Sequence, residues 1–319
     1  MPRNPTTPAI FPMIRVATLN IGLARLHLLG LTLREGVPYQ QARLPAILAY
    51  LARNAAGADV WLLQEAYGRG VARRLGLTPG FRAVAARAQG PDTGLVMLVR
   101  KGLSIGNAES LPLPAVDWVE RFVARKGLQC IDLAIDGHRF RVGNLHTSYD
   151  GRGKAEVAAR APASRRQQIT MALDSLERDA QDSTLILGGD FNASAVQEPE
   201  TFAIGHARGW LDARVDAESH DAAGVMTWSR ENPVVRGDAP DQDIDHIWIR
   251  PPAGPVRIVS RHVATRRNAV TPDGTAIPLS DHYGLVADID QGLPSAPQAG
   301  PTSPNQGNGD QTGNDQRDR

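Results

Sequence analysis

Six short motifs place a polar or charged residue at one end of an apolar run. A short, continuous apolar run is typical of a strand buried inside a sheet. The polar residue beside it then lies at the rim of that sheet, where side chains from several strands can meet. The motifs are Ala17–Asn20 (ATLN), Trp61–Glu65 (WLLQE), Gly143–His146 (GNLH), Gly189–Asn192 (GDFN), Ile244–Ile249 (IDHIWI) and Leu279–His282 (LSDH).

The side chains at these strand ends are carboxylates, carboxamides and two histidines, His146 and His282. Carboxylate and amide oxygens are the hard ligands that Mg²⁺ prefers. A phosphate ester needs donors around its phosphoryl oxygens and a group that orients or activates the attacking water. The motif set therefore predicts a site for a divalent cation and a phosphate ester.

In this order and context, the motifs resemble those of the endonuclease/exonuclease/phosphatase superfamily of Mg-dependent phosphoesterases. The resemblance runs from about Ile14 to Ile289. It implies a single α/β domain built as a four-layer α/β sandwich, in which two packed mixed sheets are flanked by helices. It also implies a phosphoester substrate and Mg²⁺ as cofactor, with Mn²⁺ as the alternative.

The resemblance assigns the metal to Glu65, assisted by Asn20 and Asp281. A carboxylate directly after a buried strand is well placed for this role, although an ordinary surface glutamate at a strand end is the alternative. Asn20 could instead cap a turn, because asparagine favours turns.

The resemblance assigns five residues to catalysis. Asp190 and Asn192 would orient or activate water and bind the scissile phosphate, although an Asx turn would also explain their spacing. His146 and His282 would flank the phosphate, with Asp245 orienting His282. His146, Asp190 and His282 all stay candidates for the general base. The neighbouring His246 is expected to point to the opposite face and to be structural.

Apolar periodicity predicts two helices and nine strands. One helix carries the stripe Leu44, Ile47, Leu48 and Leu51 and is expected to begin near Pro45, with the proline in its first turn; the other carries Ile169, Leu173 and Leu176. The expected strands are Arg15–Leu19, Val60–Leu63, Leu95–Val99, Cys130–Ile135, Phe140–Leu145, Thr184–Leu187, Ile247–Ile249, Val256–Val259 and Leu285–Ile289.

The domain is expected to span residues 14–290, after an N-terminal extension of residues 1–13. Residues 291–319 are rich in Pro, Gly, Gln and Asn and hold one aliphatic side chain larger than alanine, Leu293. Such a segment buries too little apolar surface to offset its ordering entropy, so we expect a disordered tail.

Three sequence features bear on the substrate. Residues 121–150 look most like bacterial sphingomyelinase-type members of the superfamily. The leucine-rich segment after Asn20, residues 21–33, could rest on a bilayer if exposed, or pack into the core as a short helix. Lys+Arg number 35 against 34 Asp+Glu, a net charge of +1, without the basic excess typical of a duplex-DNA binder.

We therefore expect a phosphodiesterase that attacks a lipid headgroup or a small phosphoester with water. The alternatives are an Mg-dependent endo- or exonuclease acting on DNA or RNA, a phosphomonoesterase, and a non-catalytic binding module. Nucleic acid is thus a possible substrate, and peripheral contact with a membrane is a possible interaction. The sequence leaves the oligomeric state open.

The remaining features concern the compartment. Cys130 is the only cysteine, so no disulfide can form within one chain. The N-terminus lacks the apolar stretch of a signal peptide, and no apolar run has the length of a membrane span. Cytoplasmic localisation is the default expectation.

Overall fold

The computed structural model describes residues 13–28, 31–54, 57–84, 92–151, 154–178, 180, 182–220, 226–235, 240–252, 256–263, 269–270 and 273–290. Its strands form two large mixed sheets and two small hairpins. The seven-stranded sheet has the order β12 (Ser219–His220), β14 (Arg257–Val263), β17 (Leu285–Asp290), β1 (Met13–Asn20), β4 (Val60–Gln64), β6 (Val96–Arg100) and β5 (Phe81–Val84).

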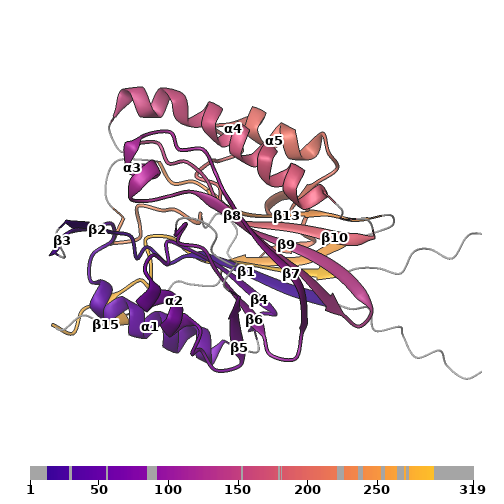
Figure 1. Ribbon diagram of the computed structural model, residues 1–319, viewed down its shortest axis with the longest axis horizontal. Helices are drawn as coiled ribbons and strands as arrows, with labels where there is room; N and C mark the ends of the chain where they lie inside the picture. Colours follow the sequence, from indigo (N-terminus) through magenta and orange to yellow (C-terminus); the bar gives the residue numbers. More distant parts are fainter. Residues whose placement is uncertain are drawn as a thin grey trace, which may run out of the picture.

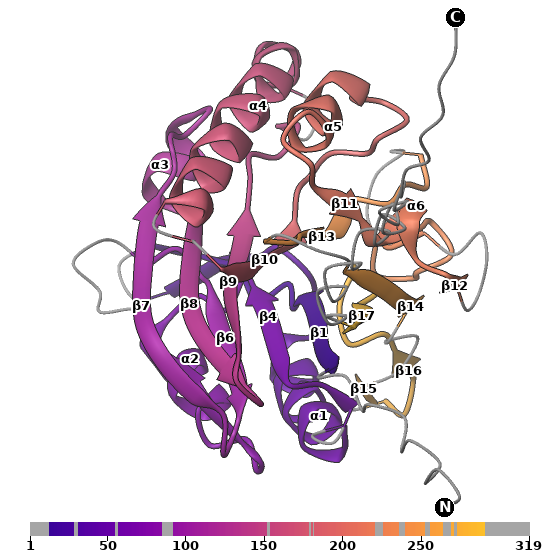
Figure 2. The same ribbon diagram turned by 90° about the vertical axis from the view of Figure 1, so that its right-hand side faces the viewer.

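The second sheet has six strands, and Figure 2 shows it facing the first. Its order is β11 (Leu211–Asp212), β13 (Asp245–Arg250), β10 (Ser183–Asp190), β9 (His138–His146), β8 (Gly127–Ile135) and β7 (Ser104–Pro112). The small hairpins are β2 (Arg25–Leu28) with β3 (Leu31–Glu35), and β15 (Ala269–Val270) with β16 (Ala276–Ile277).

Helices cover the outer face of each large sheet (Figure 1). Helices α1 (Gln40–Arg53) and α2 (Arg69–Leu75) pack on the seven-stranded sheet, whereas α4 (Ala155–Glu177) and α5 (Pro199–His206) pack on the six-stranded sheet. Two short helices, α3 (Trp118–Phe122) and α6 (Ala213–Asp216), lie in connections. The predicted four-layer sandwich is confirmed. In the described ranges, no helix combines the length and apolar character that crossing a membrane requires.

Strand alternation separates three apolar layers. In β1, Ile14 and Val16 pack between the two sheets, whereas Ala17 and Leu19 pack beneath α1 and α2. The other strands divide in the same way: Ile186 of β10 lies between the sheets, whereas its neighbours face α4 and α5. Both faces of each central strand are therefore buried, which explains the continuous apolar runs of the sequence.

Pairing brings the motif ends together. Strand β1 runs parallel to β4, so Asn20 pairs with Gln64 at one edge of the seven-stranded sheet. Strand β9 runs parallel to β10, and β13 runs antiparallel to β10. Asp190 consequently lies between His146 and Asp245 at the edge of the six-stranded sheet. This shared edge is called the site end below.

All nine predicted strands and both predicted helices are present, but other details were wrong or missing. Helix α1 begins at Gln40, so Pro45 lies inside it rather than in its first turn. Residues 25–28 and 31–35 form the antiparallel pair β2–β3 instead of a loop or short helix; the alternation of Leu31, Thr32 and Leu33 suits a strand. The partly buried strands β5 and β7, the two-residue strands and helices α2, α3, α5 and α6 were not predicted.

The expectations for the two ends of the chain lie mostly outside the described residues. Residues 1–12 and 291–319 are not described, and Met13, assigned to the N-terminal extension, is the first residue of β1. Cys130 is a buried residue of β8, as expected, and burial raises its pKa to about 12. Its thiol is therefore a packing group rather than a nucleophile.

Gly189 provides a test of how tightly the site end is built. Its φ is +148°, and a Cβ added there would lie 1.9 Å from the main-chain oxygen of Leu145. Gly189→Ala should therefore lower the free energy of unfolding by at least about 3 kcal/mol, because backbone cannot yield as a side chain can. Urea denaturation measures this, with Gly70→Ala in α2 as control.

Nothing lies within 4 Å of a Cβ built on Gly70. Gly70→Ala should leave the stability unchanged or raise it by up to about 1 kcal/mol, because alanine favours a helix over glycine. Equal stabilities of the two variants would show that the β9–β10 approach is looser than described.

Candidate active site

Asp190, the last residue of β10, lies at the centre of the site end. Its Oδ2 accepts a hydrogen bond from Asn20 Nδ2 at 2.8 Å, which joins the two sheets. Its Oδ1 accepts from the main-chain N–H of Asn192 at 2.8 Å. Burial raises the pKa of Asp190, while the charge of His282 lowers it. The carboxylate is thus fixed in place and more basic than a solvated aspartate.

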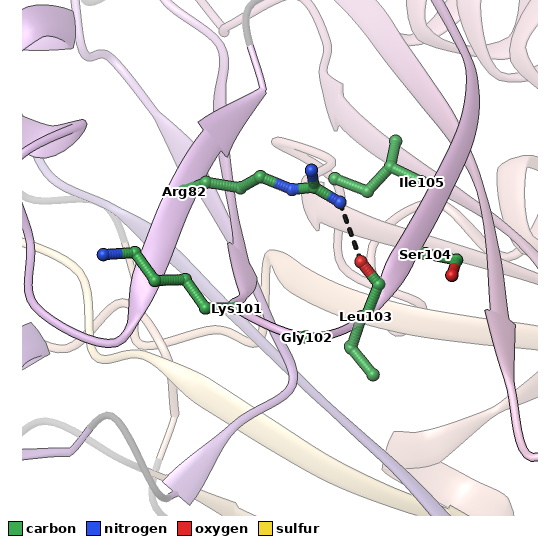
Figure 3. A pocket seen from close by; sticks show the side chains of 6 residues that line it. All are labelled: Arg82, Lys101, Gly102, Leu103, Ser104 and Ile105. Carbon is green, nitrogen blue, oxygen red and sulfur yellow. Dashed lines mark hydrogen bonds between the residues drawn. The ribbon is translucent and has the colours of Figure 1, made fainter.

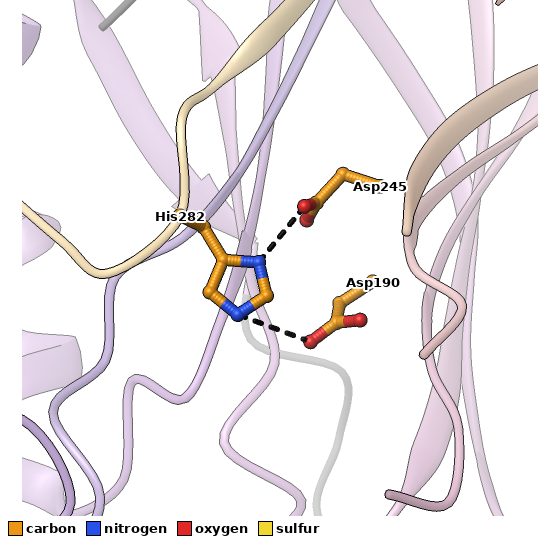
Figure 4. A group of neighbouring side chains, drawn as sticks. All are labelled: Asp190, Asp245 and His282. Carbon is orange, nitrogen blue, oxygen red and sulfur yellow. Dashed lines mark hydrogen bonds and ion pairs between the residues drawn. The ribbon is translucent and has the colours of Figure 1, made fainter. Parts of the chain in front are cut away.

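Asp245 and His282 form a buried pair beside Asp190 (Figure 4). The Nδ1 atom of His282 lies 2.8 Å from Asp245 Oδ2, and its Nε2 lies 3.8 Å from Asp190 Oδ2. Burial alone would lower the pKa of His282, but the charges of Asp245 and Asp190 raise it to about 10. His282 is therefore an imidazolium at neutral pH, with Nε2–H directed into the site.

His146 is held in the neutral form by a lysine. The Lys126 Nζ atom lies 2.6 Å from His146 Nε2. Burial, and then the charges of Lys126 and His282, lower the pKa of His146 well below 6.5. Because an ammonium can only donate, Nε2 accepts and the proton lies on Nδ1. That buried Nδ1 has no partner among the described residues.

Sequence reasoning gave Lys126 no role, although Lys126 and Gly127 were part of the resemblance. The lysine is buried directly before β8, and Gly127 pairs with His146. Tyr67 helps to position Lys126, because its hydroxyl donates a hydrogen bond to the main-chain oxygen of the preceding residue, Arg125, at 3.0 Å. Neither motif indicates the contact between Lys126 and His146 by itself; it follows from the β8–β9 register, which brings the residue before β8 next to the last residue of β9.

Glu65 follows β4 in an unusual conformation. Its φ is +55°, so the side chain departs from the alternation of the strand. Burial, and then the charge of Asp281, raise the pKa of Glu65, while Lys126 and His282 lower it. The residue is half-buried, and its carboxylate has no hydrogen-bond partner among the described residues. Among the described residues, the one hydrogen bond to the Asp281 carboxylate comes from the Ser280 hydroxyl, at 3.2 Å.

The two asparagines assigned from the motifs have distinct positions. Asn20 offers its amide to Asp190, while its oxygen accepts from the N–H of Gly22 at 2.9 Å. Asn192 has φ of +46° and donates to the oxygen of Thr147 at 3.1 Å. Asn20 therefore orients Asp190 directly, and any metal would share its oxygen with Gly22.

Buried amides and one arginine hold the site end together, and none was assigned from the sequence. Gln64 donates to Asn144 Oδ1 at 2.7 Å, which links β4 to β9 across the sheets. Arg43 of α1 is fully buried and donates to the carbonyl oxygens of Ile21, Gly22 and Leu279. It thereby fixes the loop after Asn20 against the loop that carries the LSDH motif.

His246 points to the opposite face of β13 from Asp245, as expected. It packs against Phe191 and Phe202, and its Nε2 lies 3.0 Å from the oxygen of Ala193. Its Nδ1 lies 3.6 Å from Asp212 Oδ2, too far for a good hydrogen bond but close enough for an ion pair. Burial opposes the charge of His246, but Asp212 outweighs it and raises the pKa.

Two groups of side chains could hold a divalent cation. In one, atoms of Asp190, Asp245 and His282 lie within 4.8 Å of one another. There the imidazolium already supplies the positive charge, and a metal would have to displace a strongly held proton. The other is Glu65 with Asp281, whose charge, after burial, raises the pKa of Glu65. The second group suits a metal better.

A separate hollow of about 440 Å³ lies at the opposite end of the sheets (Figure 3). Its lining includes Arg82, Lys101 and Leu103, with Arg82 donating to the Leu103 oxygen. Arg100 directly precedes Lys101 in the chain and pairs with Phe81. This pairing lies at the end of the seven-stranded sheet opposite the site end. The hollow contains no motif residue, so it is distinct from the candidate active site.

The comparisons with known proteins agree with this geometry. A model of the Endonuclease/Exonuclease/phosphatase family matches residues 17–282. No curated protein matches the chain. Sphingomyelinase C from Streptomyces griseocarneus is 22% identical, with a TM-score of 0.64 over 87% of this chain and 99% of that one.

Two further solved structures share the fold. TDP2 of D. rerio, complexed with single-strand DNA product, is 16% identical, with a TM-score of 0.63 over 88% of this chain and 99% of that one. An endonuclease/exonuclease/phosphatase family protein from Bacteroides thetaiotaomicron is 18% identical, with a TM-score of 0.64 over 89% and 99%. At these identities, the likeness shows the fold alone.

The His246–Asp212 pair predicts a pH-dependent stability. The raised pKa of His246 contributes stability that is complete below 6.5 and is lost as the pH rises through the folded value. The lowered pKa of Asp212 contributes stability that is complete above 3.8 and is lost as the pH falls through the folded value. Asp212→Asn should therefore cost most between these values, about 3–5 kcal/mol.

Urea denaturation at a series of pH values measures that cost. The difference between wild type and Asp212→Asn should shrink at higher pH, as His246 loses its proton. Asp174→Asn, which removes a surface ion pair to Arg208, should cost at most about 1 kcal/mol throughout. A cost of Asp212→Asn that does not vary with pH would contradict the assignment of a charged pair.

Proposed function

Because the chain belongs to the endonuclease/exonuclease/phosphatase family, whose members are phosphoric ester hydrolases, we propose that it hydrolyses a phosphodiester with a divalent cation bound at Glu65 and Asp281. The observation that carries this proposal is a cluster of buried carboxylates whose charges raise one another's pKa. After burial itself, the charges of Asp281 and Asp190 raise the pKa of Glu65, and the charge of Asp245 raises that of Asp190. Lys126 and His282 oppose these shifts without reversing them, although Arg43 is a further buried cation at the site end. A divalent cation would offset the repulsion that remains.

The donor set fits a hard cation. Two carboxylates, with the amide oxygen of Asn20 nearby, match the oxygen ligands of Mg²⁺ or Mn²⁺, and the remaining positions would be left to water and substrate. When bound, such an ion polarises a phosphoryl oxygen as a Lewis acid. Mg²⁺ is the proposed ion and Mn²⁺ the alternative.

The protein groups then have separable tasks. His282 donates from Nε2–H to a phosphoryl oxygen, while Asp245 holds its other nitrogen and keeps the ring protonated. His146 keeps its Nε2 side toward the site, 3.4 Å from Asp190 Oδ2. Lys126, donating to His146 Nε2, keeps the proton of His146 on Nδ1.

Asp190 is the proposed general base. Its burial-raised pKa suits it to accept a proton from water, and its bonds to Asn20 and Asn192 orient the carboxylate. The bond from water oxygen to phosphorus forms as the bond to the leaving oxygen breaks. The leaving oxygen takes a proton from solvent, and Asp190 returns the proton that it accepted to solvent, so the products are a phosphomonoester and an alcohol.

The proposed substrate is a lipid headgroup or a small phosphodiester. Resemblance of residues 121–150 to sphingomyelinase-type proteins supports this class, and the sphingomyelinase C fold is similar over nearly the whole domain. A nucleic acid is the second candidate, because the TDP2 structure that shares the fold is complexed with single-strand DNA product. Hydrolysis of sphingomyelin, supercoiled DNA, single-stranded DNA and bis-nitrophenyl phosphate, assayed in parallel, separates these classes.

Removal of the proposed metal ligand is the first test of function. Glu65→Gln keeps the shape of the side chain but removes its charge, so hydrolysis of bis-nitrophenyl phosphate should fall by roughly 10²–10³-fold. Wild-type activity should also disappear in EDTA and return with Mg²⁺ or Mn²⁺. The exposed Glu156 of α4 gives the matched control, and Glu156→Gln should be as active as wild type.

Full activity of Glu65→Gln, or of wild type in EDTA, would overturn the metal-dependent mechanism. Circular dichroism and the melting temperature show whether each variant is folded. An unchanged melting temperature is expected, because the Glu65 carboxylate makes no hydrogen bond among the described residues and its main-chain oxygen still accepts from the N–H of Leu23.

A double-mutant cycle tests the Asp245–His282 pair. The 2.8 Å contact implies that Asp245 acts through His282, so the losses should not add. The variant with Asp245→Asn and His282→Ala should be about as slow as His282→Ala alone. Activation free energies that simply add would show that Asp245 and His282 act independently, and the pairing would have to be withdrawn.

A further inference from the structure

Two aromatic side chains project from α3 at the site end. Trp118 is 61% exposed and Phe122 is 65% exposed, although large aromatic residues usually bury most of their surface. They are four residues apart on one helical turn, so they lie on the same face. An exposed aromatic pair of this kind marks an interaction site, where a partner would cover both rings.

Helix α3 is directly connected to the candidate active site. Its N-cap residue Asp117 accepts a hydrogen bond from the hydroxyl of Tyr149 at 3.2 Å. The ring of Tyr149 lies 5.9 Å from Lys126 Nζ, which in turn contacts His146. A surface that docks through α3 therefore lies beside the mouth of the site.

The exposed charges of α3 and of the lysine beside it are positive. Both acidic residues of α3 and its cap turn inward: Glu120 is fully buried, and the side chain of Asp117 is 6% exposed. Lys154 lies 5.6 Å from the Trp118 ring and pairs with Asp117 at 3.4 Å, whereas Arg121 lies 5.5 Å from the Phe122 ring. Exposed aromatic rings with flanking cations suit an interface that is both apolar and anionic.

Other exposed apolar residues share the site end. Tyr39 precedes α1, Val196 follows the GDFN motif, and Val270 lies in β15. Figure 1 shows α3, β15 and the β2–β3 hairpin together at the left end of the molecule. Valine offers no flat face for stacking a nucleobase, whereas it can enter a lipid interface. The two exposed valines, with a net charge of only +1, favour lipid over nucleic acid.

We propose that α3 docks the mouth of the site onto an anionic lipid bilayer, with Trp118 and Phe122 entering the interface and Arg121 and Lys154 contacting the headgroups. The proposal deepens the proposed function and rests on it for the use of the site. The proposed membrane contact is α3, whereas the sequence analysis had considered the leucine-rich segment of residues 21–33 for that role.

Vesicle binding by the full chain tests the proposal. Wild type should cosediment with phosphatidylcholine vesicles that contain phosphatidylglycerol, and less with phosphatidylcholine alone. The variant with Trp118→Ala and Phe122→Ala should bind at least about tenfold less, because two aromatic side chains no longer leave water. Leu77→Ala is the matched control: Leu77 is 76% exposed but follows α2 near Phe81, at the opposite end, and its loss should change nothing.

The charge contribution is tested separately. The variant with Arg121→Gln and Lys154→Gln keeps both rings, so it should lose the preference for phosphatidylglycerol while retaining weak binding. If the aromatic variant fails to fold, as circular dichroism would show, this charge variant decides the matter. An unchanged preference for phosphatidylglycerol would then overturn the proposal.

Hydrolysis of water-soluble bis-nitrophenyl phosphate separates this proposal from the proposed function. The aromatic variant should hydrolyse it at the wild-type rate, because neither ring belongs to the catalytic groups. Wild type that binds vesicles but does not hydrolyse any diester would overturn the function and leave the docking surface intact. Wild type that hydrolyses the diester but ignores vesicles would overturn the docking surface alone.

A single-stranded oligonucleotide gives the remaining outcome. If the aromatic variant loses affinity for the oligonucleotide while vesicle binding is unchanged, α3 is a stacking platform for bases. That result would overturn the assignment of a lipid bilayer.

Discussion

Excess negative charge, buried where two sheets end together, is the constraint on which the rest of the structure depends. Like charges in a water-poor site repel strongly, so each carboxylate needs a cation or a set of donors. Asp245 has His282, and Asp190 has the amide of Asn20. Among the described residues, the Glu65 carboxylate has no hydrogen-bond partner and Asp281 has the Ser280 hydroxyl alone, and the proposed metal follows from that deficit.

The resemblance predicted the four-layer sandwich, and the strand-end motifs predicted that polar side chains meet at the rim of a sheet. The strand order was not predicted; Asn20 meets Gln64, and His146 meets Asp190, because their strands run parallel and end at the same edge. The Asp245–His282 pairing came from the resemblance, and the 2.8 Å contact agrees with it. Strand alternation also explains why His246, one residue further, serves the core instead of the site.

Other parts depend on contacts that local patterns do not encode. Glu65 reaches the site through a positive φ, which no strand pattern predicts. Lys126 gains its importance from a contact with His146 on a neighbouring strand. Gln64 of β4 and Asn144 of β9 join the two sheets through a hydrogen bond of 2.7 Å between their buried side chains, and the strand patterns do not show that these two residues lie opposite each other. The β2–β3 hairpin was missed because short leucine-rich segments suit a helix and a strand about equally well.

Direct metal binding tests the central claim more closely than activity does. Titration of Mn²⁺ into the full chain, followed by electron paramagnetic resonance, measures the affinity of wild type, Glu65→Gln and Asp245→Asn. The account predicts one tight site per chain, weakened at least about tenfold by Glu65→Gln and much less by Asp245→Asn. The reverse order would place the metal among Asp190, Asp245 and His282 and would contradict the assignment of His282 as a protonated donor.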